Sequence, residues 1–256
     1  MRNRWRSSIL TFWVALSVAP AIIAQTPAQT PSGSTPDLSG VWLRRQNIRT
    51  FNVQEPPPLA PWAAEIYRAN RQGIPDPLAS GVDEMDPTIY CLPDGMPRIY
   101  LSNYPFEIVP APGKLFMHFE NGGQVRRIYL DGRAMPEAYP PSFMGFATGR
   151  WQGDTLVVET SGFTDLRWID RTGTPHSDAL RVVERIRRVA PEALEIDFVF
   201  ADSEAFTKPW SGKKAFDLQP DWELMEHNGL CEDRHRYEYS QKSLLGTKDW
   251  TSPGEF

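Results

Sequence analysis

Apolar and polar residues alternate through much of the chain, which is the pattern of half-buried β-strands. The clearest example is residues 194–201, where large apolar side chains occupy every second position. Similar segments are separated by turns rich in Pro, Gly and Asn, as in hairpins. The predicted strands are residues 106–110, 114–120, 124–131, 155–160, 180–189 and 194–201, together with a first strand entered at 37–42 and one ending near 151.

This succession predicts a mainly β fold, an antiparallel meander that closes into a barrel, with a sandwich as the alternative. Residues 180–189 also carry apolar residues at helical spacing, but their Pro-containing turn to the next strand favours β-structure. One short helix is predicted near residues 61–71, where Pro61 stands at the first turn and Trp62 and Ile66 share a face.

The hairpin formed by residues 114–120 and 124–131 places several chemical side chains on one face. A two-residue loop at Asn121-Gly122 or Gly122-Gly123 pairs positions of the same face, and the opposite face is nearly all apolar. The mixed face is therefore either solvated or the lining of a pocket. Its members are Phe116, His118, Arg127 and Tyr129.

The first 24 residues have the order of a secretory signal peptide: three arginines, an apolar run and small residues at candidate cleavage sites. A membrane anchor is the alternative, although the run is shorter than the roughly 20 residues that span a bilayer. Residues 25–36 form a Pro-, Ser- and Thr-rich tether. We therefore expect a single β-rich domain at residues 37–256, in the periplasm or secreted, with no membrane insertion after cleavage.

Charge and cysteine content narrow the partners and the compartment. Cleavage removes three positive charges and takes the net charge from −5 to −8, which argues against nucleic acid and anionic membrane surfaces. An oxidising compartment favours a disulfide between Cys91 and Cys231, and two buried thiols are the alternative. No HExxH, CxxC pair or Gly-rich phosphate loop occurs, so neither a metal nor another cofactor is predicted.

An irregular segment at residues 161–178 is crowded with polar and aromatic side chains. His176 with Asp165 or Asp170 has the composition of a general base and its orienting carboxylate. The alternative is that these groups cap turns and the next strand. A triad using Ser177 is disfavoured, because adjacent residues rarely aim their side chains at each other and no nucleophile elbow is present.

The string GRWxGDTLVVxTxGFxDxxWxDxxGxPHSDxLxxxER at residues 149–185 resembles an uncharacterised family of secreted bacterial proteins. Shorter stretches at residues 91–98, 128–133, 208–210 and 223–226 are similar to it as well. The resemblance covers roughly residues 37–235 and implies no established reaction. The expected barrel is also similar in architecture to lipocalin and other calycin barrels, and such a likeness carries no function by itself.

The leading hypothesis is a cofactor-independent hydrolase, lyase or isomerase that binds a small organic or carbohydrate-like molecule at the open end of the barrel. The acid–base groups would be His176, Asp170, Asp165 and His118. The ligand would be held by Tyr129, Trp168, Phe116, Arg127 and Arg150. A non-catalytic periplasmic carrier using the same pocket is the second hypothesis, and a structural protein with a filled interior is the third.

Overall fold

The computed structural model describes residues 35–51, 55–71, 86–90 and 92–225. The predicted signal peptide, nearly all of the tether and both cysteines lie outside these residues, so the disulfide stays a prediction. The described strands are β1 Gly40–Arg44, β2 Phe106–Ala111, β3 Lys114–Phe119, β4 Gln124–Tyr129, β5 Phe146–Gln152, β6 Thr155–Ser161, β7 Arg181–Ala190, β8 Ala193–Ala201 and β9 Trp210–Leu218. The helical elements are α1 Pro61–Asn70 and two 3-10 turns, η1 Pro87–Tyr90 and η2 Arg98–Leu101.

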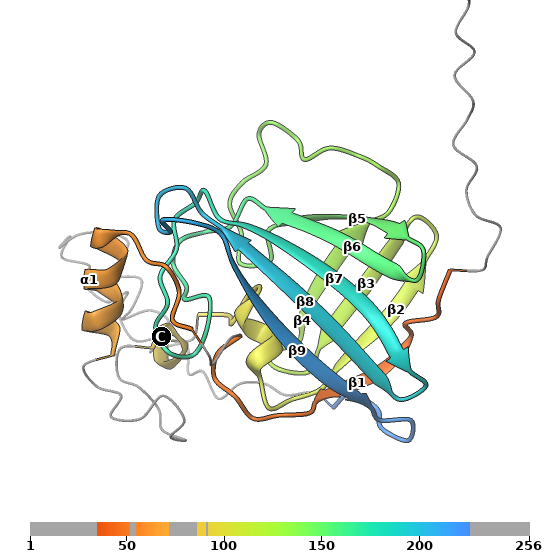
Figure 1. The fold of residues 1–256 in the computed structure, drawn as a ribbon. Coiled ribbons are helices and arrows are strands. Elements are labelled where there is room, and N and C mark those ends of the chain that lie inside the picture. The colour runs from red at the N-terminus through yellow and green to blue at the C-terminus, as the bar shows by residue number, and fades with distance from the viewer. Residues whose placement is uncertain (1–34, 52–54, 72–85, 91, 226–256) are drawn as a thin grey trace, which may run out of the picture. The chain divides into compact units, whose positions relative to one another are not determined.

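The strands pair in chain order and close into a barrel, because β1 bonds to both β2 and β9 (Figure 1). The predicted barrel and short helix are thus confirmed. The meander departs from the prediction at one pair: β4 and β5 run parallel, with Ile128 opposite Ala147. The long connection at residues 130–145 returns the chain to the starting end of β4, which makes a parallel neighbour possible.

The β3–β4 hairpin has the register expected from a turn at Asn121-Gly122, with Phe116 opposite Arg127. A hydrogen bond of 3.2 Å from the Gly123 N–H to the Glu120 carbonyl closes this turn. Strand alternation also places the apolar set of β3 inside the barrel, as predicted. Arg126 of β4 shares this interior face, which the predicted apolar composition did not include.

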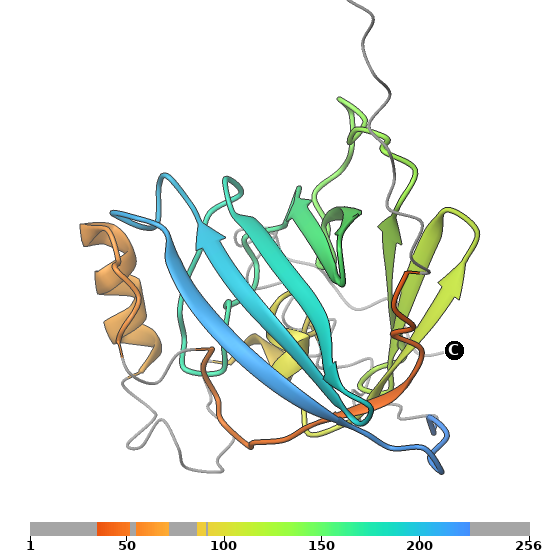
Figure 2. The ribbon, with the colours of Figure 1, turned by 45° about the vertical axis from the view of Figure 1, so that its right-hand side comes forward.

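Large side chains fill the barrel interior around η2, whose four residues are all buried. Figure 2 shows this yellow turn between the blue and cyan strands on one side and the yellow-green strands on the other. The Tyr100 ring packs edge-on at 5.6 Å from Phe106, 5.7 Å from Phe119 and 5.6 Å from Phe198. This filling gives the described barrel a packed core.

A buried ion pair joins two opposite parts of the barrel wall. Arg126 of β4 pairs with Glu184 of β7, and its Nη1 lies 2.9 Å from the Glu184 Oε1. Arg126 also donates to the Thr160 hydroxyl at 2.8 Å and to the Tyr100 hydroxyl at 3.0 Å, and Tyr100 donates to Glu184 at 2.9 Å. The two charges therefore have hydrogen-bonding partners, as buried charges require.

Helix α1 lies beside the barrel rather than in its core, and Trp62 and Ile66 are 44% and 45% exposed. The Trp62 indole N–H donates to the Glu204 carbonyl at 2.8 Å. Within the described residues, no helix has both the length and the apolar character needed to cross a membrane.

Candidate functional site

The predicted loop at residues 161–178 is organised by Asp170, which is buried. One carboxylate oxygen accepts hydrogen bonds from the Thr172 N–H (2.8 Å), the Thr172 hydroxyl (2.9 Å) and the Thr174 N–H (3.2 Å). The other accepts from the Thr174 hydroxyl at 2.7 Å. Both oxygens thus hold the loop's own turns, which is the capping role expected for short polar side chains.

His176 is also buried, and its Nδ1 lies 2.8 Å from the Ser177 carbonyl oxygen, to which it donates. Burial lowers the pKa of His176, while the Ser177 carbonyl and the charges of Asp202 and Asp165 act in the opposite direction. Asp165 is therefore near enough to influence His176 electrostatically. Among the described residues, no hydrogen bond joins His176 to Asp165 or Asp170.

The mixed face of the β3–β4 hairpin lies outside the barrel, with His118 half-buried there. The Arg127 guanidinium lies 5.6 Å from the Phe116 ring centre and 5.9 Å from that of Tyr129. Arg150 lies on the surface of β5 in an exposed ion pair with Glu159 at 2.8 Å. The structure brings Phe116, Arg127 and Tyr129 together, and the described contacts do not connect them to His176.

Trp168 contributes to a buried charge network at one end of the barrel. Its ring lies 5.6 Å from the Arg98 guanidinium, which donates to Asp94 at 3.0 Å and pairs with Asp86. Arg167 donates to the same Asp94 oxygen at 2.8 Å. Burial would raise the pKa of Asp94, but the charges of Arg98 and Arg167 lower it to about 2. This network ties the predicted loop to the segment around η2.

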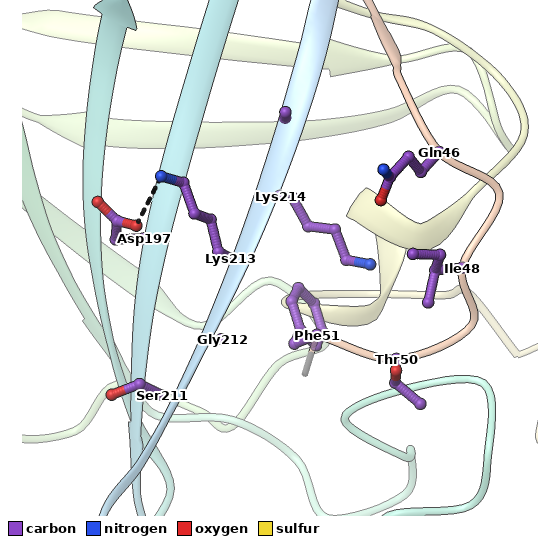
Figure 3. Close-up of a pocket in the computed structure, with 10 residues that line it drawn as sticks. Gln46, Ile48, Thr50, Phe51, Asp197, Ser211, Gly212, Lys213 and Lys214 are labelled. Atoms are coloured by element: carbon purple, nitrogen blue, oxygen red, sulfur yellow. Dashed lines mark ion pairs between the residues drawn. The ribbon is translucent and has the colours of Figure 1, made fainter. Parts of the chain in front are cut away.

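The strongest candidate for a ligand site is a cleft of about 490 Å³ beside β9 (Figure 3). Directly after β1, the Arg45 N–H donates a hydrogen bond of 2.9 Å to the Ala215 carbonyl of β9. It returns to β9 where the Lys213 N–H donates to the Phe51 carbonyl at 3.1 Å. We call residues 46–51, between these two hydrogen bonds, the arc. The cleft is lined by Gln46, Ile48, Thr50, Phe51, Asp197, Ser211, Gly212, Lys213, Lys214 and Ala215.

Lys214 is the side chain that gives the cleft its chemical character. It is only 7% exposed, and its Nζ lies 5.8 Å from the centre of the Phe51 ring. Figure 3 shows it extending from β9 toward the arc, where Ile48 lines the same cleft. Within the described residues, no hydrogen bond or ion pair joins its ammonium group to a carboxylate. Burial and the charge of Arg44 lower the pKa of Lys214 to about 8, with Asp170 acting in the opposite direction.

The neighbouring Lys213 provides a direct contrast. It points to the other face of β9, toward Asp197 (Figure 3), and its side chain is 52% exposed. Its Nζ lies 2.7 Å from Glu195 and 3.7 Å from Asp197. Hydrogen bonding to Glu195 raises the pKa of Lys213. Adjacent positions of one strand thus carry an exposed lysine in an ion pair and a buried lysine that has no ion pair within the described residues.

The predicted loop at residues 161–178 is hydrogen-bonded to the arc that forms one side of the cleft. The Arg49 guanidinium donates to the Arg171 carbonyl at 2.7 and 3.1 Å, and the Arg171 N–H donates to the Arg49 carbonyl at 3.0 Å. Asp170 and Arg44 act electrostatically on Lys214. The Thr50 hydroxyl in the arc is buried without a hydrogen-bond partner among the described residues. The site therefore combines positive charge with an unused hydroxyl, and this combination suits a small anion.

The sequence prediction did not include Lys214, Arg44 or the arc. Lys214 lies an even number of positions from Trp210 and Phe216, so its side chain is on the same face of the strand as theirs. A charged residue on this interior-facing side was the sequence feature that could have indicated the site. The sequence matches no protein-family model and no curated protein.

Proposed function

We propose that this protein is a periplasmic or secreted binding protein that holds a small organic anion in the cleft between the arc and β9. The observation that carries the proposal is the buried ammonium group of Lys214, which forms no ion pair with a carboxylate within the described residues. A volume of about 490 Å³ falls within the usual range for small-molecule sites. The predicted signal peptide supports the compartment.

The electrostatics of the cleft favour a negatively charged ligand. Lys214 is close enough to Arg44 for the two positive charges to repel each other, and Arg171 acts on Arg44 in the same way. A bound carboxylate reduces both repulsions and supplies the counter-charge that Lys214 lacks. Ile48 and Phe51 offer apolar contact to the rest of such a ligand. A carboxylate with a short apolar body therefore fits the lining best.

Binding without catalysis is better supported than His/Asp acid–base chemistry. The carboxylate of Asp170 is used in the turns of its own loop, and the Nδ1 of His176 donates to a backbone carbonyl. His118 lies on the outer face of β3. Within the described residues, His176 makes no hydrogen bond to Asp165 or Asp170, and His118 lies on a different element, whereas binding in the cleft needs none of these groups.

The test is calorimetric titration of the mature protein with a panel of short-chain carboxylates at neutral pH, hexanoate among them. We expect binding that weakens as salt is raised, because charge pairing contributes to it. Lys214→Met should weaken binding about tenfold or more, because it removes a buried charge partner. Lys208→Met is the matched control, at an exposed position outside the cleft lining, and should change affinity little. If no carboxylate binds, or if both variants bind like the wild type, the proposal is wrong.

A further inference from the structure

Lys214 has the surroundings of a nucleophilic amine as well as those of a binding group. An amine reacts with a carbonyl only in its neutral form, and burial beside another cation is a known way to favour that form. Lys214 has both conditions: it is 7% exposed and lies near Arg44. Its ammonium group also has no carboxylate partner among the described residues that would stabilise the charged form.

We propose that Lys214 forms an imine with a small oxo acid or anionic aldehyde bound in the cleft. This inference rests on the proposed function, because the same cleft must first hold the anionic ligand. It goes further by naming a carbonyl as the second feature of that ligand. The cleft is then a site of reversible covalent capture.

The bond changes are those of ordinary imine formation. The neutral Lys214 nitrogen attacks the carbonyl carbon, the C=O π electrons move to oxygen, and a nitrogen proton is transferred to that oxygen. The resulting hydroxyl takes a second proton from solvent and leaves as water, while the nitrogen lone pair forms the C=N bond. The products are a protonated imine and one water, and no oxidant or reductant is needed. Hydrolysis by the reverse steps releases the ligand.

The lining accommodates both ends of such a ligand. The carbonyl would lie at the Lys214 Nζ, beside the Phe51 ring, which lies 5.8 Å away. The carboxylate would lie toward the amide of Gln46, which lines the cleft and which Figure 3 shows on the arc side of Lys214. The Thr50 hydroxyl, which has no hydrogen-bond partner among the described residues, would be a further donor to the ligand's oxygens.

The pKa of Lys214 supports this assignment and sets the working pH. At a pKa of about 8, about half of these side chains are neutral at pH 8, whereas an ordinary lysine is under about 1% neutral. The charged groups that act on it are Arg44 from β1 and Asp170 from the loop. On the arc, the guanidinium of Arg49 donates a hydrogen bond to the Arg171 carbonyl. Lys213, with its raised pKa, should react far less.

The experiment is borohydride trapping on the mature protein at pH 8 with 2-oxohexanoate, which differs from hexanoate only by its carbonyl. Borohydride reduces the imine to a stable secondary amine, and peptide mass mapping then locates it among the six lysines of the chain. We expect one adduct per molecule at Lys214, at least about tenfold above any other lysine given the neutral fractions above. Lys214→Arg should abolish the adduct, and Lys208→Arg, at an exposed position outside the cleft lining, should keep it.

Mapping on the wild-type protein compares adjacent lysines in one molecule, so the result does not depend on how a variant folds. Equal labelling of Lys213 and Lys214, or no adduct, overturns the inference. The hexanoate titration separates the two proposals. If hexanoate binds in a Lys214-dependent manner and 2-oxohexanoate gives no adduct, the binding function stands and the imine is wrong. If hexanoate does not bind and no adduct forms, both are wrong.

Discussion

The buried position of Lys214 should make this residue destabilising in the absence of a ligand. Its pKa is about 8 in the folded protein and 10.5 in an ordinary lysine, so between these values the unfolded chain binds more protons than the folded one. Wild-type stability therefore rises as the pH increases from 8 to 10.5, and below pH 8 the whole cost is present. Functional groups held in this way commonly reduce stability.

Lys214→Met keeps a long side chain and removes the charge. We expect the variant to be more stable than the wild type by about 1–3 kcal/mol at pH 7, with the difference fading toward pH 10.5. Urea denaturation at pH 7 and pH 10 measures it. Lys213→Met, at an exposed and ion-paired position, should change stability by no more than about 1 kcal/mol at either pH. A destabilised Lys214→Met variant at pH 7 would contradict the assigned environment.

Among the elements, β9 and the arc depend on a close approach that only glycine allows. A Cβ atom added at Gly212 would lie 2.5 Å from the Phe51 Cβ and 3.1 Å from the Phe51 carbonyl oxygen. Both are tighter than ordinary van der Waals contact, and Phe51 is itself packed against Phe198 at 4.7 Å. The arc therefore has to move if this position carries a side chain.

Gly212→Ala should displace Phe51 and weaken the hydrogen bond from the Lys213 N–H to the Phe51 carbonyl. We expect a loss of about 1–3 kcal/mol in unfolding free energy, as for other overpacked sites. Carboxylate affinity should fall with it, and amide hydrogen exchange at residue 213 should become faster. Gly153→Ala is a suitable control, since a Cβ there meets nothing within 4 Å, although its positive φ adds some strain. Unchanged exchange at residue 213 would show that the arc is not held at Gly212.

The strands that the sequence predicted are those whose interior positions are apolar, such as β8 with Leu194, Ile196 and Phe198. Strand β9 was missed because its interior-facing set includes Gly212 and Lys214, which break the alternation. The 3-10 turn η2 was missed for a related reason: four residues are too few for a helical period. Gly212 and Lys214, which break the apolar pattern of β9, line the cleft, and the short turn η2 fills the core.

For the described domain as a whole, the predicted loop and the observed cleft are related but not identical. The loop at residues 161–178 was singled out by composition, and in the structure it supports the arc through Arg171 and acts on Lys214 through Asp170. The cleft itself joins residues 46–51 to β8 and β9, more than 140 positions away in the sequence. A single sequence gives no signal for such a pairing, because the closure of β1 on β9 creates it.

The Arg126–Glu184 pair connects β4 and β7 across the filled interior, so its loss should affect the stability of the whole barrel. Removing one partner leaves a buried charge uncompensated, and Glu184→Leu should cost about 3–5 kcal/mol in unfolding free energy. The double variant Arg126→Met/Glu184→Leu removes both charges and should recover much of that cost. The Tyr100 hydroxyl loses a partner in both variants, and the Thr160 hydroxyl loses Arg126 in the double variant, so the recovery will be incomplete. Urea denaturation of the wild type, both single variants and the double variant gives the coupling energy. Additive single effects would contradict the pairing, and a large coupling would show that charge compensation inside the barrel is a main determinant of its stability.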